Sequence, residues 1–147
     1  MNFISTNMTD NITPLERRRT QRYLVDLPVD IVLQDGSVLP VVTCNMSRKG
    51  LQFRCDSWIA DEIEPRGIQN HPLDAVRVKA ITDFPDMGKY NSRLYARCRI
   101  VVARRLSEEE YLIGLEFVDF ENGSERLLER YINRCDAEGF RKILSSG

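Results

Sequence analysis

Hydrophobic and polar residues alternate along much of the chain with a period of two, which is typical of half-buried β-strands. The clearest run follows Tyr23, and its apolar members are Val25, Leu27, Val29, Ile31 and Leu33. The pair Asp35-Gly36 then predicts a two-residue hairpin turn, and the valine-rich segment 37–43 supplies the returning strand. Four more segments fit the strand pattern, at 51–55, 75–84, 95–106 and 110–117.

Two stretches depart from this rhythm and predict helices. Trp58, Ile59 and Ile63 have the spacing of one or two helical turns, and we expect Trp58 to anchor the core or a loop. A longer helix is predicted from Ser124, with an apolar stripe formed by Leu127, Leu128, Tyr131 and Ile132. After Gly139, residues 140–144 either extend this helix or fold back as a tail.

Six short strands and one terminal helix predict an all-β fold, namely a six-stranded antiparallel β-barrel with a C-terminal α-helix. A length of 147 residues suits one domain with one core. We expect a flexible N-terminal tail at 1–13, the barrel domain with its closing helix at 14–136, and a C-terminal tail or helix extension at 137–147.

Composition and charge narrow the function classes. The chain has 42% hydrophobic and 29% charged residues, no apolar run long enough to span a membrane and no N-terminal secretory signal, so we expect a cytoplasmic protein without membrane contact. The net charge is −1, so there is no global field to hold a nucleic acid polymer. Of the 21 basic residues 17 are Arg, and those at 97, 99, 104 and 105 are expected to be strand-face charges.

Metal, cofactor and enzyme chemistry find little support. No pair of cysteines forms a CxxC motif, and His71 is the only histidine. We expect reduced, mostly buried thiols, and neither a metal nor a cofactor. No catalytic triad context, HExxH motif or glycine-rich phosphate loop is present, so we expect no enzyme. The four cysteines are Cys44, Cys55, Cys98 and Cys135.

The candidate binding residues fall in two groups separated by the first predicted hairpin. The first group places four guanidinium groups within six residues, a concentrated site for an anion with flat, bidentate acceptor edges. The second group is a polar turn with short side chains and a glycine, which lets a ligand approach the backbone. Together they predict one site for an anionic, nucleotide-like molecule. The residues are Arg17, Arg18, Arg19 and Arg22 in the first group, and Asn45, Ser47 and Gly50 in the second.

The spacing of these residues resembles the paired signature of PilZ domains. Arg18-xxx-Arg22 corresponds to RxxxR, and Asn45-x-Ser47-xx-Gly50 corresponds to [D/N]xSxxG. The segment 113–117, Ile-Gly-Leu-Glu-Phe, is similar to the closing strand of the family, and the resemblance covers roughly 15–135. Asn45 stands where Asp is commoner, and the segment 56–72 is longer than the usual link, so it is a candidate protein-specific surface.

The resemblance implies a receptor for cyclic di-GMP, a bacterial second messenger. Arg18 and Arg22 would then hold guanine edges and phosphates, with assistance from Arg17 and Arg19. Asn45 would accept from the N1 and N2 donors of guanine, Ser47 would contact a phosphate or base, and Gly50 would allow close approach. Binding would reposition the N-terminal segment and so regulate an unidentified protein effector. The alternatives are a PilZ-like adaptor without ligand, and a small barrel that binds single-stranded nucleic acid.

Overall fold

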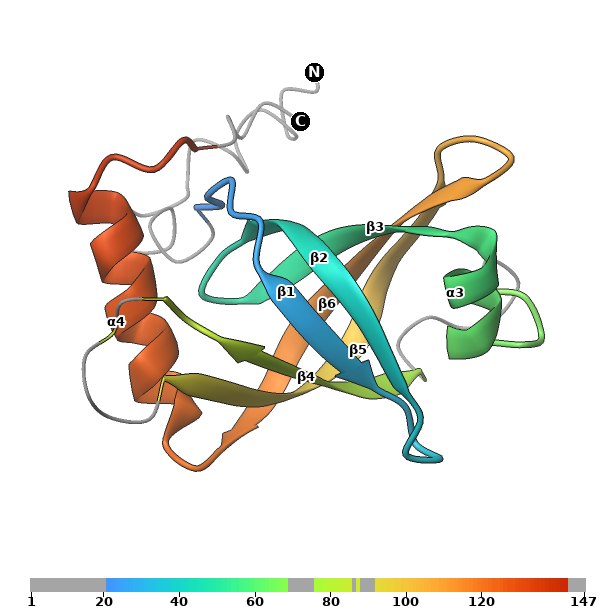
Figure 1. The fold of residues 1–147 in the computed structure, drawn as a ribbon, viewed down its shortest axis with the longest axis horizontal. Helices are drawn as coiled ribbons and strands as arrows, with labels where there is room; N and C mark the ends of the chain where they lie inside the picture. The colour runs from blue at the N-terminus through green and yellow to red at the C-terminus, as the bar shows by residue number, and fades with distance from the viewer. Residues whose placement is uncertain (1–20, 69–75, 86, 88–91, 143–147) are drawn as a thin grey trace, which may run out of the picture.

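Six antiparallel strands form a closed barrel in the order β1-β2-β3-β6-β5-β4, as seen in the computed structural model (Figure 1). The structure describes residues 21–68, 76–85, 87 and 92–142. Helix α4 lies at one end of the barrel and α3 at the other (Figure 1). The predicted fold class is therefore confirmed. The elements are β1 (Pro28–Val32), β2 (Val38–Met46), β3 (Gly50–Asp56), α3 (Ser57–Ile63), β4 (Arg77–Asp83), β5 (Arg93–Arg105), β6 (Glu110–Glu121) and α4 (Ser124–Ala137).

The interior of the barrel is filled by the apolar residues of the period-two pattern. Ile31, Phe53, Leu94 and Ile100 are fully enclosed, although each has polar or exposed neighbours along its strand. Alternate residues point to opposite faces of a strand, so one face packs into the core while the other meets solvent. Burial of these side chains is the main source of stability for such a fold.

The first strand begins later than the alternation predicts, because the side chain of Thr43 interrupts the ladder. Its hydroxyl donates to the carbonyl of Val25 at 2.8 Å and accepts from the amide of Leu27 at 2.9 Å. The amide of Thr43 still donates to the carbonyl of Leu27 at 2.9 Å, but the hydroxyl takes the other two backbone groups, so regular pairing starts at Pro28 although Val25 and Leu27 remain buried.

Between β1 and β2 the turn has three residues, 34–36, inside the closing pair of Leu33 and Ser37, and not the predicted two. The amide of Leu33 bonds the carbonyl of Ser37 at 2.8 Å, and the amide of Gly36 bonds the carbonyl of Leu33 at 3.0 Å. Gly36 has φ +91°, which is the left-handed conformation that ends a turn of this length.

Helix α3 confirms the predicted helical turns between the third and fourth strands. The carboxylate of Asp56 accepts from the amide of Ile59 at 2.9 Å and caps its N-terminus, while Ala60 and Ile63 are buried. Trp58, however, is 62% exposed, so the prediction that it anchors the core or a loop is wrong. The apolar face of this short helix is formed by other residues, and the indole lies on its outer side.

Helix α4 begins at Ser124 as predicted and ends in a reversal at Gly139. Gly139 has φ +72°, and the amide of Phe140 bonds the carbonyl of Cys135 at 3.0 Å, as in a Schellman motif. The chain then folds back, and the carbonyl of Arg141 accepts from the amide of Leu24 at 2.7 Å. Fold-back is thus observed as far as residue 142, and residues 143 and 144 lie outside the described part.

Two further predictions touch the chain as a whole. The four cysteines are free in the structure, three of them buried and Cys44 half-buried, which confirms the prediction that most of them are buried. Among the described residues, none of the helices has the length and apolarity to cross a membrane. The predicted tail at 1–13 and the arginines at 17, 18 and 19 lie outside the described residues.

Candidate ligand-binding site

The polar turn between β2 and β3 is held by its own backbone and by the hydroxyl of Ser47. The amide of Ser47 donates to the carbonyl of Gly50 at 2.8 Å, and the amide of Lys49 donates to Ser47 Oγ at 3.1 Å. Ser47 is 1% exposed, so its hydroxyl serves the turn in this structure. The short polar side chain predicted at this position therefore first shapes the loop that carries it.

Gly50 is required by the neighbouring strand. A Cβ atom added there would lie 1.9 Å from the backbone oxygen of Leu115 on β6, far inside van der Waals contact. The sequence interpretation gave Gly50 the close approach of a ligand, and that contact stays a prediction. The close approach that the structure describes is between β3 and β6.

Arg22 and Asn45 bring the two predicted groups into direct contact. Arg22 Nη1 donates to Asn45 Oδ1 at 2.7 Å, across 23 residues of sequence. Arg22 is partly buried, and this burial lowers the pKa of its guanidinium from the ordinary value. Desolvation makes this cation responsive to any anion that reaches it, because charges interact more strongly in a lower dielectric.

The amide of Asn45 is fully engaged on its other side as well. Its Nδ2 donates to Gln52 Oε1 at 2.8 Å and to Cys44 Sγ at 3.6 Å, and Asn45 itself is 4% exposed. Burial raises the pKa of the Cys44 thiol, while the positive charges of Arg54 and Arg22 oppose that rise. Gln52 and Arg54 therefore flank the site from β3. Sequence reasoning missed both, although their alternation with the buried residues of the third strand places them on the outer face.

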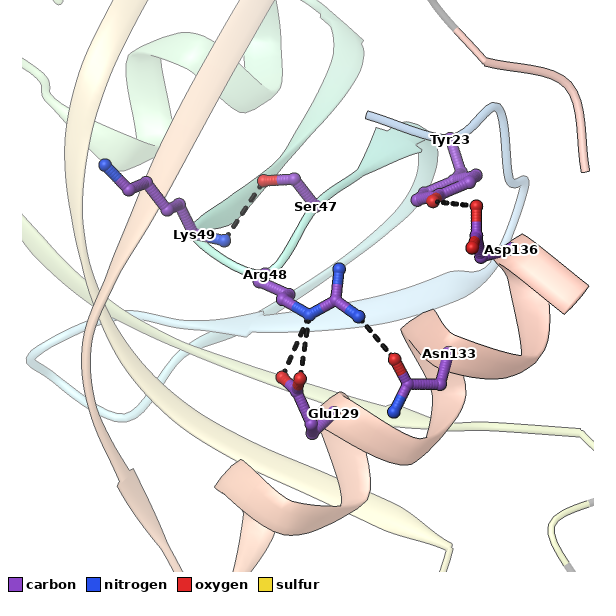
Figure 2. A network of polar contacts seen from close by, with 7 residues as sticks. All are labelled: Tyr23, Ser47, Arg48, Lys49, Glu129, Asn133 and Asp136. Atoms are coloured by element: carbon purple, nitrogen blue, oxygen red, sulfur yellow. Dashed lines mark hydrogen bonds and ion pairs between the residues drawn. The ribbon is translucent and has the colours of Figure 1, made fainter. Parts of the chain in front are cut away.

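A second set of contacts joins the same turn and the segment before β1 to helix α4 (Figure 2). Arg48 points from the turn to Glu129 and Asn133, and the hydroxyl of Tyr23 bonds Asp136. None of these residues was among the sequence candidates. Arg48 fills a variable position of the NxSxxG pattern, and its partner Glu129 is 81 residues away, so no local pattern indicates the contact.

Three arginines of β5 form ion pairs across strands, and two of them, Arg97 and Arg99, are among the predicted strand-face charges. Arg104 and Arg105 are exposed on the same strand. The positive face that a nucleic acid polymer would need is therefore interrupted by carboxylates in the described part of the barrel. Within the same residues, no cluster of His, Cys, Asp or Glu could hold a metal ion. The pairs are Arg93 with Asp83, Arg97 with Asp119, and Arg99 with Glu116.

The sequence model of the PilZ domain matches residues 16–134, which is most of the chain. The chain belongs to the PilZ domain family. The match includes both motif halves, the barrel and nearly all of α4. No curated protein sequence matches this PilZ domain.

Solved structures share the fold of this PilZ domain at low sequence identity. The Bacillus subtilis inhibitor of motility MotI/DgrA has a TM-score of 0.61 at 17% identity, over 84% of this chain and 54% of that one. The Borreliella burgdorferi PlzA protein in complex with c-di-GMP has a TM-score of 0.55 at 12% identity, over 92% and 57%. The PilZ domain of Escherichia coli YcgR with c-di-GMP has a TM-score of 0.54 at 15% identity, over 83% and 94%. The chain thus spans about half the length of the first two.

Proposed function

We propose that this PilZ domain is a receptor for cyclic di-GMP and has no catalytic role. The ligand is held by Arg18 and Arg22 from one side and by Asn45 and Ser47 from the other. The observation that carries the proposal is the 2.7 Å contact between Arg22 Nη1 and Asn45 Oδ1, because it brings a cation of RxxxR against a polar group of NxSxxG. Membership of the family supports the choice of ligand.

The chemistry of the contact suits a guanine base and a phosphate. A guanidinium can donate two parallel bonds to guanine O6 and N7 or to two phosphate oxygens. The oxygen of Asn45 can accept from guanine N1 or N2. In the free protein these two groups satisfy each other, so the ligand replaces an internal hydrogen bond instead of filling unpaired groups. Part of the gross binding energy is spent on this exchange.

Ligand binding can change the position of the segment that precedes β1. Arg22 is followed at once by Tyr23, which pairs with Met46 of β2, and it is preceded by the remaining arginines of the motif. The ligand neutralises the charges of these arginines and holds the segment in place. The chain ahead of β1 then takes a new position, which a protein effector can recognise.

Isothermal titration with cyclic di-GMP tests the proposal, and cyclic di-AMP is the matched control ligand. The two dinucleotides share the ring and both phosphates, but adenine presents an amino donor where guanine presents the O6 acceptor. We expect saturable binding of cyclic di-GMP and at least tenfold weaker binding of cyclic di-AMP. Equal affinities would mean that only phosphates are recognised, and absence of heat at millimolar ligand would refute the receptor function.

Two variants and a control locate the binding site on the protein. Arg22→Ala removes charge-assisted hydrogen bonds worth about 1.5–3 kcal/mol, so it should weaken binding by roughly ten- to a hundredfold. Ser47→Ala should also weaken binding, whereas Arg105→Ala should not. Arg105 is the matched control because its guanidinium bonds carbonyls of the β5–β6 loop, at Ser107 and Glu108. A weak salt dependence of binding would also separate this receptor from a nucleic acid binder, whose affinity falls steeply with salt.

A further inference from the structure

Arg48 ties the polar turn to helix α4 by several bonds from one side chain. Its Nε donates to Glu129 Oε1 at 2.9 Å and to Oε2 at 3.0 Å, and its Nη2 donates to Asn133 Oδ1 at 2.5 Å (Figure 2). The Arg48 side chain is only 12% exposed, whereas that of Glu129 is 55% exposed. A guanidinium enclosed to this degree needs its partners, because burial of an unpaired charge is strongly unfavourable.

Tyr23 ties the other motif half to the same helix. Its hydroxyl donates to Asp136 Oδ1 at 2.9 Å, and the residue is 3% exposed. Its backbone also pairs with Met46 in both directions, at 2.9 and 3.0 Å, one residue before Ser47. A shift of Tyr23 would therefore move its chain neighbour Arg22, and also the end of β2 at Met46, which leads into the turn.

The three partners on α4 form one polar stripe. Glu129, Asn133 and Asp136 have the spacing i, i+4 and i+7, which places them on the same face of a helix. Beside this stripe, the buried residues Leu128, Ile132 and Cys135 fix the helix to the barrel. The stripe is therefore fixed with respect to the core, and the side chains of Arg48 and Tyr23 reach it from the binding segments.

We propose that Arg48 and Tyr23 are positioning residues through which the Glu129–Asn133–Asp136 stripe of α4 holds both motif halves in the arrangement that takes up the ligand. This rests on the proposed function, and it makes α4 part of the receptor although the helix contributes no group to the ligand. Coupling of this kind is reciprocal, so the ligand in turn stabilises the docking of α4 by the same factor.

Glu129→Ala is the decisive variant, since it removes the carboxylate partner of Arg48 without changing a residue of either motif. Alanine is the best helix former, so α4 itself is retained. We expect five- to twentyfold weaker binding of cyclic di-GMP in isothermal titration, within the usual range for coupling between sites. In the free protein, we expect faster hydrogen exchange at the amides of residues 48–50. Glu138→Ala is the matched control, because it removes the Arg134–Glu138 ion pair at the C-terminal end of the same helix and leaves the turn untouched.

The direction in which the affinity for cyclic di-GMP changes shows whether Arg48 positions the turn or contacts the ligand directly. If Glu129 competes with the ligand for Arg48, Glu129→Ala binds more tightly, and that result overturns the proposal, as does an unchanged affinity. In a background that carries both Glu129→Ala and Asn133→Ala, Arg48→Ala should cause no further loss, because both partners of Arg48 on α4 are already gone. A further loss of tenfold would mean that Arg48 touches the ligand and would also overturn it.

Failure of this proposal is distinguishable from failure of the receptor function. If wild-type protein binds cyclic di-GMP and Glu129→Ala binds it equally well, only the role of α4 is refuted. If wild-type protein binds no cyclic di-GMP, the receptor function is refuted and the coupling falls with it.

Discussion

Replacement of Gly50 by alanine should damage the barrel before it affects any ligand. The added Cβ would lie 1.9 Å from the Leu115 oxygen, and real Cβ atoms essentially never come within 3.0 Å of such a neighbour. The backbones of β3 and β6 must therefore separate locally by about 1.1 Å, because the obstacle is main chain and cannot rotate away. A backbone hydrogen bond lengthened by that distance is lost.

The expected size of the effect follows from the bonds at this point. The amide of Phe117 donates to the carbonyl of Lys49 at 2.7 Å, beside the clash. The amide of Ser47 donates to the carbonyl of Gly50 itself at 2.8 Å. Each buried group left without a partner costs about 1–3 kcal/mol, so Gly50→Ala should lower the free energy of unfolding by about 3 kcal/mol or more. That corresponds to a fall in Tm of roughly 10 °C for a domain of this size.

Thermal and urea unfolding followed by circular dichroism measure this loss, with Gly36→Ala as the control. Gly36 has no atom within 4 Å of an added Cβ, so its substitution carries only the strain of a left-handed alanine, about 1 kcal/mol. If Gly50→Ala were within about 0.5 kcal/mol of wild type, the steric argument would be refuted. If that stable variant also failed to bind cyclic di-GMP, the glycine would be serving the ligand instead.

Three other predictions address the segment before β1 and the thiols. Thr43→Val should lower the free energy of unfolding by about 2–3 kcal/mol in urea titrations, because it leaves the buried Val25 carbonyl and Leu27 amide unpaired; a loss below about 0.5 kcal/mol would contradict this. Cys44 should be the one thiol that reacts with a disulfide reagent in the folded protein, and slowly, since burial raises its pKa; labelling of a second cysteine under native conditions would show otherwise. Burial, aided by the hydrogen bond to Asp136, raises the pKa of Tyr23 from about 10 to about 12, so the folded state holds the phenol proton more tightly. The resulting stability is complete below pH 10 and is lost as pH rises towards 12, and Tyr23→Phe should flatten this part of the unfolding profile; identical profiles would exclude the linkage.

The strand pattern was readable from the sequence because burial on one face imposes a period of two on each strand. Six alternating segments and a helical stripe from Ser124 were sufficient to predict the barrel and its closing helix. The exact start of β1 could not be predicted from the sequence, since it depends on which backbone groups the Thr43 hydroxyl binds. Trp58 was misplaced for a related reason: helical spacing indicates a face but does not say which face meets the core.

The site was predictable only in part. Arg22 and Asn45 could be paired in advance because each belongs to a motif with a chemical role, and the structure brings them into contact. Arg48 could not be found this way, because its partners lie more than 80 residues downstream and become neighbours only when α4 packs. For Gly50 the reverse holds. The sequence identified it as a motif residue, but it did not indicate that the backbone of β6 requires a glycine there.

The reversal after α4 also has a practical consequence for engineering. Because the Leu24 amide donates to the Arg141 carbonyl at 2.7 Å, the chain enters and leaves the barrel at neighbouring points. A module with adjacent entry and exit can be spliced into a surface loop of a host protein without stretching it. This barrel is therefore suited to insertion into a host such as a fluorescent protein or an enzyme.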